Sequence, residues 1–242
     1  SKVTSEEIHV LYGTNGGGFG VFNENLELIF GDNVILHKVE SNGLIDLLDR
    51  IHKRTKIGYI FYLALRAWNF KCYLYVKKRI NYAGQITHQF NPIGFREPGY
   101  LYRLNQTHVW GPIAGAENVM IGSISPSNLL FKVQTVLKNK LNEFQLRSCR
   151  IARATSATDY FIFATEGSKD IFVNKYEVSE YSISPESAVQ VVAPFSETQM
   201  DSWNHCYKLL YVGSLIPRKN VILLVYVLES LTKRDSKYHL TL

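Results

Sequence analysis

The fold prediction starts from residues 208–242, which read KLLYVGSLIPRKNVILLVYVLESLTKRDSKYHLTL. The first six residues are mostly apolar, favour β structure and end at Gly213, which predicts a strand followed by a turn. An apolar stripe at helical spacing comes next, formed by Val221, Leu224, Val225, Leu228 and Leu231. Residues 238–242 predict a second strand. A strand, a helix and a strand in this order predict a parallel sheet with a right-handed crossover.

The same alternation extends upstream through most of the chain. Strands are predicted at residues 8–12, 34–40, 84–89, 107–110 and 160–165. Helices are predicted around 44–51, with Ser41 or Asn42 as N-cap, and at 58–78 and 166–173. Glycines at 111–115 predict a turn. A further helix is predicted to begin at Ser125-Pro126. Its apolar stripe is predicted to pack against a core and consists of Leu130, Val133, Leu137, Leu141 and Phe144.

These elements predict an α/β protein with two Rossmann-like parts. Residues 1–194 form the predicted N-terminal parallel-sheet domain, and residues 207–242 begin a second domain of the same kind. The polar stretch between them, 195–206, has no clear periodicity and is predicted to be the linker. In this interpretation the first domain lacks its opening strand and the second is incomplete at Leu242.

Composition excludes several classes of protein. A hydrophobic content of 46% with 13% aromatic residues is enough for a core, which excludes disorder. The net charge of +6 suits a phosphate-bearing ligand or an anionic membrane surface, but it is too small for a dedicated nucleic-acid binder. Three scattered cysteines, without a CxxC pair, indicate a reducing cytoplasmic setting. The most apolar segment, 57–65, is about half of the roughly 20 residues that a membrane span requires.

Chemistry is expected where parallel strands end, because loops at their carboxyl ends lead into helix N-termini that favour anions. Three segments have this placement, and each contains glycine next to polar or charged residues. They are THQFNPIGFREPG at 87–99, WGPIAGAEN at 110–118 and GSLIPRKN at 213–220.

Together these segments resemble the bacterial retaining group 1 glycosyltransferases of the GT-B fold, which build surface polysaccharides and lipopolysaccharide. The similarity covers residues 87–104, 110–118 and 209–231, and extends to SPESAV at 184–189. It implies transfer of a sugar from a nucleotide-diphosphate sugar to a glycan or polyprenol-linked acceptor. It implies no further cofactor, and the absence of HExxH, DxD and Cys/His clusters agrees with an enzyme that uses no metal.

The resemblance assigns the donor side of the reaction to the second domain. Lys219 is similar to the lysine that binds the donor diphosphate, although a solvated lysine on a first helical turn explains its spacing about as well. Relatives commonly carry arginine after the strand glycine, where this chain has Ser214. The residues implied in donor binding, besides Lys219, are Gly213, Ser214, Arg218 and Glu186.

The acceptor side falls in the first domain. His88 resembles the active-site histidine of the family, and the alternative is a hydrogen-bonded structural histidine at a strand end. Gly111, Gly115 and Glu117 resemble the loop that lines the acceptor. Arg96 is a further acceptor-binding candidate, although a surface ion pair with the neighbouring Glu97 is the favoured interpretation.

Two classes of function remain in view. The first is the glycosyltransferase, in the cytoplasm and with peripheral contact with the inner membrane left open. The second is a non-catalytic relative that binds or assembles with a partner, which Ser214 and the altered SPESAV loop favour. The absence of GxGxxG argues against a dehydrogenase, and the absence of GxSxG argues against a hydrolase.

Overall fold

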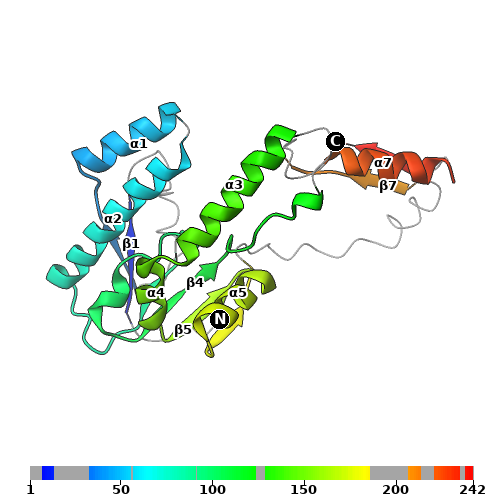
Figure 1. Cartoon of the computed structure of the whole chain (residues 1–242). Helices are drawn as coiled ribbons and strands as arrows, with labels where there is room; N and C mark the ends of the chain where they lie inside the picture. Colours follow the sequence, from blue (N-terminus) through cyan, green and yellow to red (C-terminus); the bar gives the residue numbers. More distant parts are fainter. Residues whose placement is uncertain are drawn as a thin grey trace. The chain divides into compact units, whose positions relative to one another are not determined.

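The computed structural model describes residues 7–13, 33–55, 57–90, 92–123, 129–185, 207–213, 221–234 and 238–241. Within these residues the paired strands run parallel and helices lie between them in sequence, so the predicted α/β class is confirmed (Figure 1). The chain divides into two compact units. The first unit comprises residues 1–117 and 143–186, and the second comprises 118–142 and 187–242. The predicted linker lies outside the described residues.

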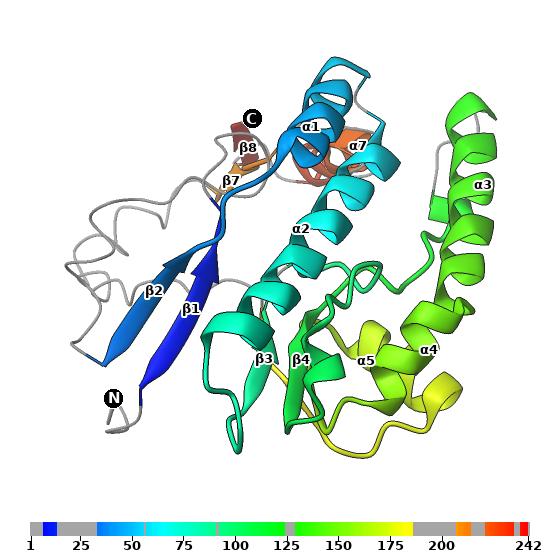
Figure 2. The same ribbon diagram turned by 90° about the vertical axis from the view of Figure 1, so that its left-hand side faces the viewer.

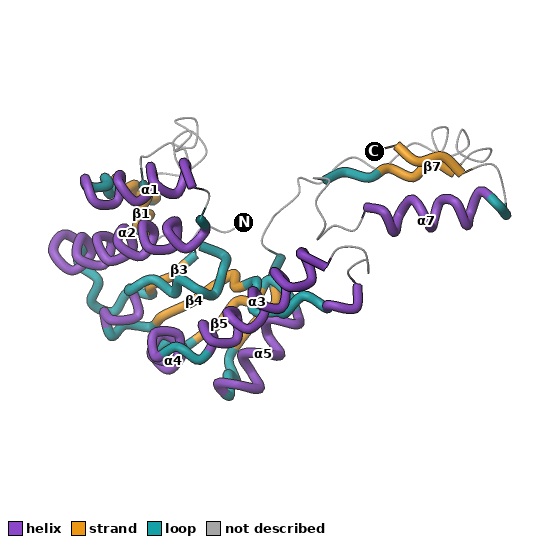
Figure 3. The backbone as a smooth tube through the Cα atoms, turned by 45° about the horizontal axis from the view of Figure 1, so that its top comes forward, coloured by secondary structure: helices purple, strands orange, loops and turns teal. Residues whose placement is uncertain are grey.

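A four-stranded parallel sheet organises the first unit. Its strands lie in sequence order and are β3 (Thr87–Gln89), β4 (His108–Ile113), β5 (Tyr160–Phe163) and β6 (Tyr181–Ile183). Figure 3 shows β3, β4 and β5 side by side. Two short 3-10 helices, Leu101–Leu104 and Ile121–Ser123, flank β4 in the sequence. The carboxyl ends of the four strands therefore meet at one edge of the sheet.

Two helices after β4 and β5 begin at side-chain caps. α4 (Cys149–Ser156) follows Ser148, whose hydroxyl accepts from the backbone N–H of Ile151 at 3.4 Å. α5 (Glu166–Tyr176) follows Thr165, which accepts from the N–H of Ser168 at 3.2 Å. Such caps satisfy backbone donors that a helix leaves without an internal partner, which fixes where each helix starts.

The N-terminal part of the first unit is a separate strand pair with two helices. β1 (Ile8–Tyr12) pairs with β2 (Val34–Lys38), and α1 (Gly43–Thr55) packs against α2 (Gly58–Arg79), as Figure 2 shows. Asn42 caps α1 as predicted, through a bond of 3.1 Å from the N–H of Ile45. The predicted Leu44, Leu47 and Ile51 stripe is exposed, and Ile45 and Asp49 are buried instead.

The predicted packing of the long helix α3 (Leu129–Leu146) is wrong. Its apolar stripe is exposed, with Leu130 and Phe144 more than 70% accessible, while Asn142 on its polar side is buried. The contacts recorded for the helix lie on its polar side. Asn139 accepts from the backbone N–H of Val119 at 3.1 Å and donates to its carbonyl at 2.9 Å. The polar side of α3 therefore contacts the preceding segment, where the prediction expects the apolar side to be packed.

An aromatic cluster forms the core of the first unit. Phe172 of α5 is fully buried, with ring centroids at 5.7 Å from Trp110 of β4, 5.5 Å from Phe163 of β5 and 6.5 Å from Phe95. Ile151 and Ala154 of α4 belong to the same cluster. The helices α4 and α5 are therefore held on the sheet by apolar burial, which is the main favourable term in folding.

Gly111 lies inside this sheet and not in the turn predicted at 111–115. Strand β4 continues to Ile113, and its register with β5 shifts between Trp110 and Ile113. Gly111 has a φ of 149°, and a Cβ there would lie 2.2 Å from the carbonyl oxygen of Ile162. Glycine is required because the neighbouring backbone occupies the space that a side chain would need.

The second unit contains a βαβ arrangement, as the sequence predicts. β7 (Tyr207–Leu210) pairs in parallel with β8 (Tyr238–Thr241), and α7 (Val221–Thr232) lies between them in sequence. Many apolar side chains of α7 are exposed, including Ile222, Leu223 and Tyr226.

We expect Phe172→Ala to destabilise the first unit by about 3–5 kcal/mol, because it removes the ring around which the cluster packs and leaves a cavity. Urea unfolding followed by tryptophan fluorescence measures this loss. The matched control is Phe144→Ala, whose ring is 73% exposed. Equal losses in the two variants would contradict the assignment of Phe172 to the core.

Candidate functional site

His88 lies in β3, near the edge of the sheet where the carboxyl ends of the strands meet, and its side chain is exposed. Its Nε2 lies 2.9 Å from the carbonyl oxygen of Gly111, and its ring meets Phe90 edge-on at 5.6 Å. A carbonyl only accepts, so the neutral imidazole carries its proton on Nε2 and its lone pair on Nδ1. His88 can therefore accept a hydrogen bond from a hydroxyl group while the backbone of β4 holds the ring.

A second histidine, His108, lies buried at the start of β4. Its Nδ1 is 2.9 Å from the hydroxyl of Thr87, and its buried Nε2 has no hydrogen-bond partner among the described residues. The pKa of His108 is lowered to about 4, mainly by burial and also by the nearby His88, against the opposing effect of Asp159. His108 is therefore a neutral structural residue at physiological pH.

The predicted acceptor loop lies beyond β4. Gly111 is buried in the strand, whereas Gly115 lies after it with a φ of 77° in the left-handed region. Glu117 accepts hydrogen bonds from the hydroxyls of Thr165 and Ser168, the latter at 3.3 Å. These two residues belong to the start of α5, where a carboxylate is stabilised by the helix dipole. In this structure Glu117 is held by the protein's own helix terminus.

Arg96 and Glu97 do not form the surface ion pair that the sequence suggested. Glu97 is fully buried, and its carboxylate is paired with Arg66 of α2 at 3.2 Å and with Arg150 of α4. Asn69 of α2 donates to the same carboxylate at 3.4 Å. Burial raises the pKa of Glu97, and the two arginines oppose that rise. The neighbouring residues point to different partners because the chain turns between them.

Arg96 donates from Nε to the side-chain oxygen of Gln145 at 2.8 Å, and its guanidinium lies 4.7 Å from the ring centre of Phe95. Both contacts hold the side chain in place. The structure thus brings His88 to Gly111, and it places a terminal nitrogen of Arg96 beside Gly115. Arg96 also lines a separate cavity in the first unit.

The donor residues are only partly described. Gly213 lies after β7, at its carboxyl end, as the prediction requires. Ser214, Arg218, Lys219 and Glu186 lie outside the described residues. Their roles stay predictions.

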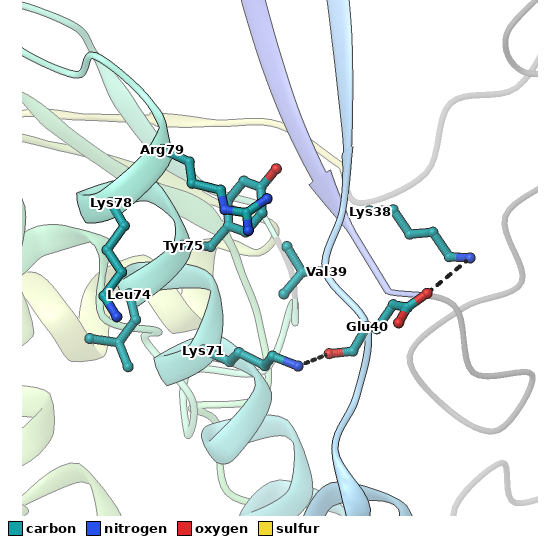
Figure 4. Close-up of a pocket in the computed structure, with 8 residues that line it drawn as sticks. All are labelled: Lys38, Val39, Glu40, Lys71, Leu74, Tyr75, Lys78 and Arg79. Carbon is teal, nitrogen blue, oxygen red and sulfur yellow. Dashed lines mark hydrogen bonds and ion pairs between the residues drawn. The ribbon is translucent and has the colours of Figure 1, made fainter.

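A basic cavity of about 390 Å³ lies between the end of β2 and the second half of α2 (Figure 4). Lys38 pairs with Glu40 at 3.3 Å, and Lys71 donates to the backbone carbonyl of Glu40. The remaining cationic side chains on its wall are Lys78 and Arg79. An excess of lysine and arginine over one glutamate makes the cavity attractive to anions.

A histidine pair adjoins this cavity through Tyr75. Nε2 of His37 lies 2.8 Å from Nδ1 of His9, and its Nδ1 lies 3.2 Å from the hydroxyl of Tyr75. Burial lowers the pKa of His37, and the repulsion from His9 adds to the effect. The two rings cannot both be protonated without bringing like charges together.

The rule that ligands bind at strand ends predicts neither the basic cavity nor the cavity that Arg96 lines. For the second cavity the sequence signal is the spacing of Tyr59, Tyr62 and Arg66, which places them on one face of the predicted helix at 58–78. Glu97, which pairs with Arg66 and Arg150, is distant from both in the sequence and carries no local signal.

Comparison with protein-family models, curated proteins and solved structures finds no match for this chain. In the described part of the chain, no three histidine, cysteine or acidic side chains are grouped so that they could hold a metal ion. No described helix combines the length and apolar character needed to cross a bilayer.

Glu97→Ala should destabilise the first unit by about 3–5 kcal/mol, because it leaves two arginine charges at a buried site without their carboxylate. Urea unfolding gives the free energy. Glu166→Ala is the matched control, since Glu166 is exposed and pairs only at the surface with Lys169. A loss below about 1 kcal/mol at Glu97 would mean that the buried pair contributes no more than a surface pair.

Stability should depend on pH through His108. Its folded pKa of about 4 lies below the usual histidine pKa of 6.5, so between these values the unfolded chain binds the proton. The stabilisation is complete above pH 6.5 and falls by about 3 kcal/mol as the pH drops to 4. His108→Asn keeps a donor toward Thr87 and should flatten this slope, whereas His52→Asn should leave it unchanged. Unfolding free energies at pH 4.5, 5.5 and 7 distinguish the two results.

Proposed function

We propose that the protein is a retaining group 1 glycosyltransferase of the GT-B fold, acting in surface polysaccharide biosynthesis. It would move a sugar from a nucleotide-diphosphate sugar to a glycan or polyprenol-linked acceptor. The observation that carries the proposal is the parallel β7–α7–β8 unit. It supports the role of residues 213–220, because a segment that leads from a parallel strand into a helix is where phosphates bind.

The donor chemistry needs positive charge at the diphosphate. As the glycosidic bond breaks, negative charge builds on the leaving group and the sugar acquires oxocarbenium character. Lys219 is the proposed diphosphate contact, and Arg218 is a candidate for the cation that Ser214 does not supply. One charge-assisted contact of this kind contributes about 1.5–3 kcal/mol.

His88 is proposed to contact a hydroxyl of the reacting sugar. The support is its exposed ring and its bond to the carbonyl of Gly111, which leaves Nδ1 as an acceptor. The alternative, a hydrogen-bonded structural histidine at a strand end, fits the same bond to Gly111, and the transfer rate of the His88→Ala variant distinguishes the two roles. Gly115 follows on the acceptor side, while Glu117 is a weaker candidate because its carboxylate already accepts two bonds from the protein.

We further propose that the protein works in the cytoplasm, at the inner membrane surface. The basic cavity beside α2 supports this, since lysines and arginines are attracted to anionic lipid headgroups.

Donor binding tests the proposal. With the purified protein, one of UDP-glucose, UDP-galactose or GDP-mannose should raise the melting temperature. Lys219→Ala should weaken binding of that donor by about ten-fold or more. His88→Ala should keep the thermal shift and slow transfer of labelled sugar, because it removes a contact to the reacting part of the donor.

Lys233→Ala is the matched control, because Lys233 follows α7 and pairs at the surface with Glu229. It should leave binding and transfer unchanged. A protein that is stabilised by none of a broad panel of nucleotide sugars would not be this enzyme, and the non-catalytic binding protein would then be the better account.

A further inference from the structure

A second cavity in the first unit is lined by arginines and aromatic rings. It has a volume of about 300 Å³ and lies between the first half of α2 and the region where α3 ends and α4 begins. The wall includes Tyr59, Tyr62, Arg66, Arg96, Phe144 and Arg150. None of its lining residues, all of which are described, is acidic. The cavity is separate in its residues from the His88 edge and from the basic cavity beside β2.

The arginines are held by contacts that fix them without neutralising all their charge. Arg66 and Arg150 share one carboxylate, that of Glu97, so this group of three carries a net positive charge. Arg66 uses Nε for that pair and its side chain is 42% exposed. Its two terminal nitrogens, Nη1 and Nη2, have no hydrogen-bond or ion-pair partner among the described residues. They remain able to donate to a ligand.

Apolar groups line the same cavity. They are Leu63, Ile151, Phe144 and the rings of Tyr59 and Tyr62. Gln145 links Arg96 to Tyr59, since it accepts from Arg96 at 2.8 Å and donates to the hydroxyl of Tyr59 at 3.4 Å. Rigid side chains of both kinds around one small space are typical of a ligand site, and the volume lies at the low end of the range of such pockets, about 300–1,000 Å³.

We propose that this cavity binds a small phosphate monoester whose phosphate is attached to an aromatic or alkyl group. The phosphate lies against Arg66, with Arg96 and Arg150 lining the same cavity, and the apolar group lies against the tyrosine rings. This site goes beyond the proposed sugar transfer, and its test needs no nucleotide sugar.

Phosphate fits better than a carboxylate. Guanidinium forks match phosphate oxygens in pairs, and a monoester offers three terminal oxygens where a carboxylate offers two. A monoester also carries a charge of about −1.5 to −2 at neutral pH, against −1 for a carboxylate. A bare phosphate would make no use of the apolar wall, which is why an attached apolar group belongs to the proposal.

Titration calorimetry with phenyl phosphate tests the site, with benzoate and inorganic phosphate as separate arms. We expect one phenyl phosphate per chain, bound at least about ten-fold more tightly than either of the other two. Arg66→Gln should weaken phenyl phosphate about ten-fold or more. Arg153→Gln, which removes an exposed arginine from α4 outside the cavity, should not.

A second variant, Tyr59→Leu, tests the site without disturbing the ion pairs of Glu97. The hydroxyl of Tyr59 is bonded to Gln145 and not to that carboxylate. The variant should weaken phenyl phosphate and leave inorganic phosphate unchanged, with an unchanged melting temperature. Equal weakening by Arg66→Gln and Arg153→Gln would show unspecific charge binding and overturn the proposal. So would inorganic phosphate or benzoate binding as tightly as phenyl phosphate, or a titration without saturable binding. A chain that binds phenyl phosphate but no nucleotide sugar would support this site and refute the proposed transfer.

Discussion

The buried carboxylate of Glu97 is the constraint on which the first unit depends. It lies in the segment between β3 and β4 and joins this segment to Arg66 and Asn69 of α2 and to Arg150 of α4. Taking a carboxylate out of water is costly unless opposite charges and hydrogen bonds replace its hydration. The folded chain therefore has to bring α2 and α4 to the same point. This requirement fixes the path of the β3–β4 segment more tightly than apolar packing alone, which is non-directional.

The same segment leads into the edge of the sheet where the site candidates lie. After Glu97, Gly99 contributes its carbonyl to Arg150 at 3.2 Å, and the chain then enters the short helix before β4. In β4, the close approach of Ile162 to Gly111 brings the strands together at the point where the carbonyl of Gly111 holds His88. The position of an exposed histidine is in this way set by buried contacts. A residue placed on a rigid strand needs less reorganisation to contact a ligand than one on a loop.

Periodicity was sufficient to predict most of the elements and their parallel pairing. Helix α2 was predicted at 58–78 and runs from Gly58 to Arg79, and the βαβ unit at the end of the chain has the predicted order. Packing was harder to predict. The apolar stripe of α3 is exposed, and Asn139 on the polar side bonds to the backbone of Val119 instead. An apolar stripe in the sequence does not show which segment packs against it.

The sequence indicates where candidate residues lie but not which charges they meet. Strand ends indicate His88 and Gly115, since that rule needs only the order of the elements. Glu97 pairs with Arg66 and Arg150, which are 31 and 53 positions away in the sequence, so the sequence suggests the adjacent Arg96 as its partner instead. Glu117 is predicted to line the acceptor, and its partners Thr165 and Ser168 carry no local signal because they lie 48 and 51 positions away.

One helix explains why two cationic cavities occur in the same unit. The buried residues of α2 include Leu65, Asn69, Cys72 and Val76, which follow one stripe along its 22 residues. Side chains flanking this stripe line the arginine cavity in the first half and the lysine-rich cavity in the second half. The two differ in chemistry, because guanidinium forks fit one oriented oxyanion whereas ammonium groups act as mobile point charges. The first cavity, with aromatic walls and arginines held by Glu97 and Gln145, is thus suited to selecting a particular small ligand. The second is suited to a surface of diffuse negative charge, where position matters less than total charge.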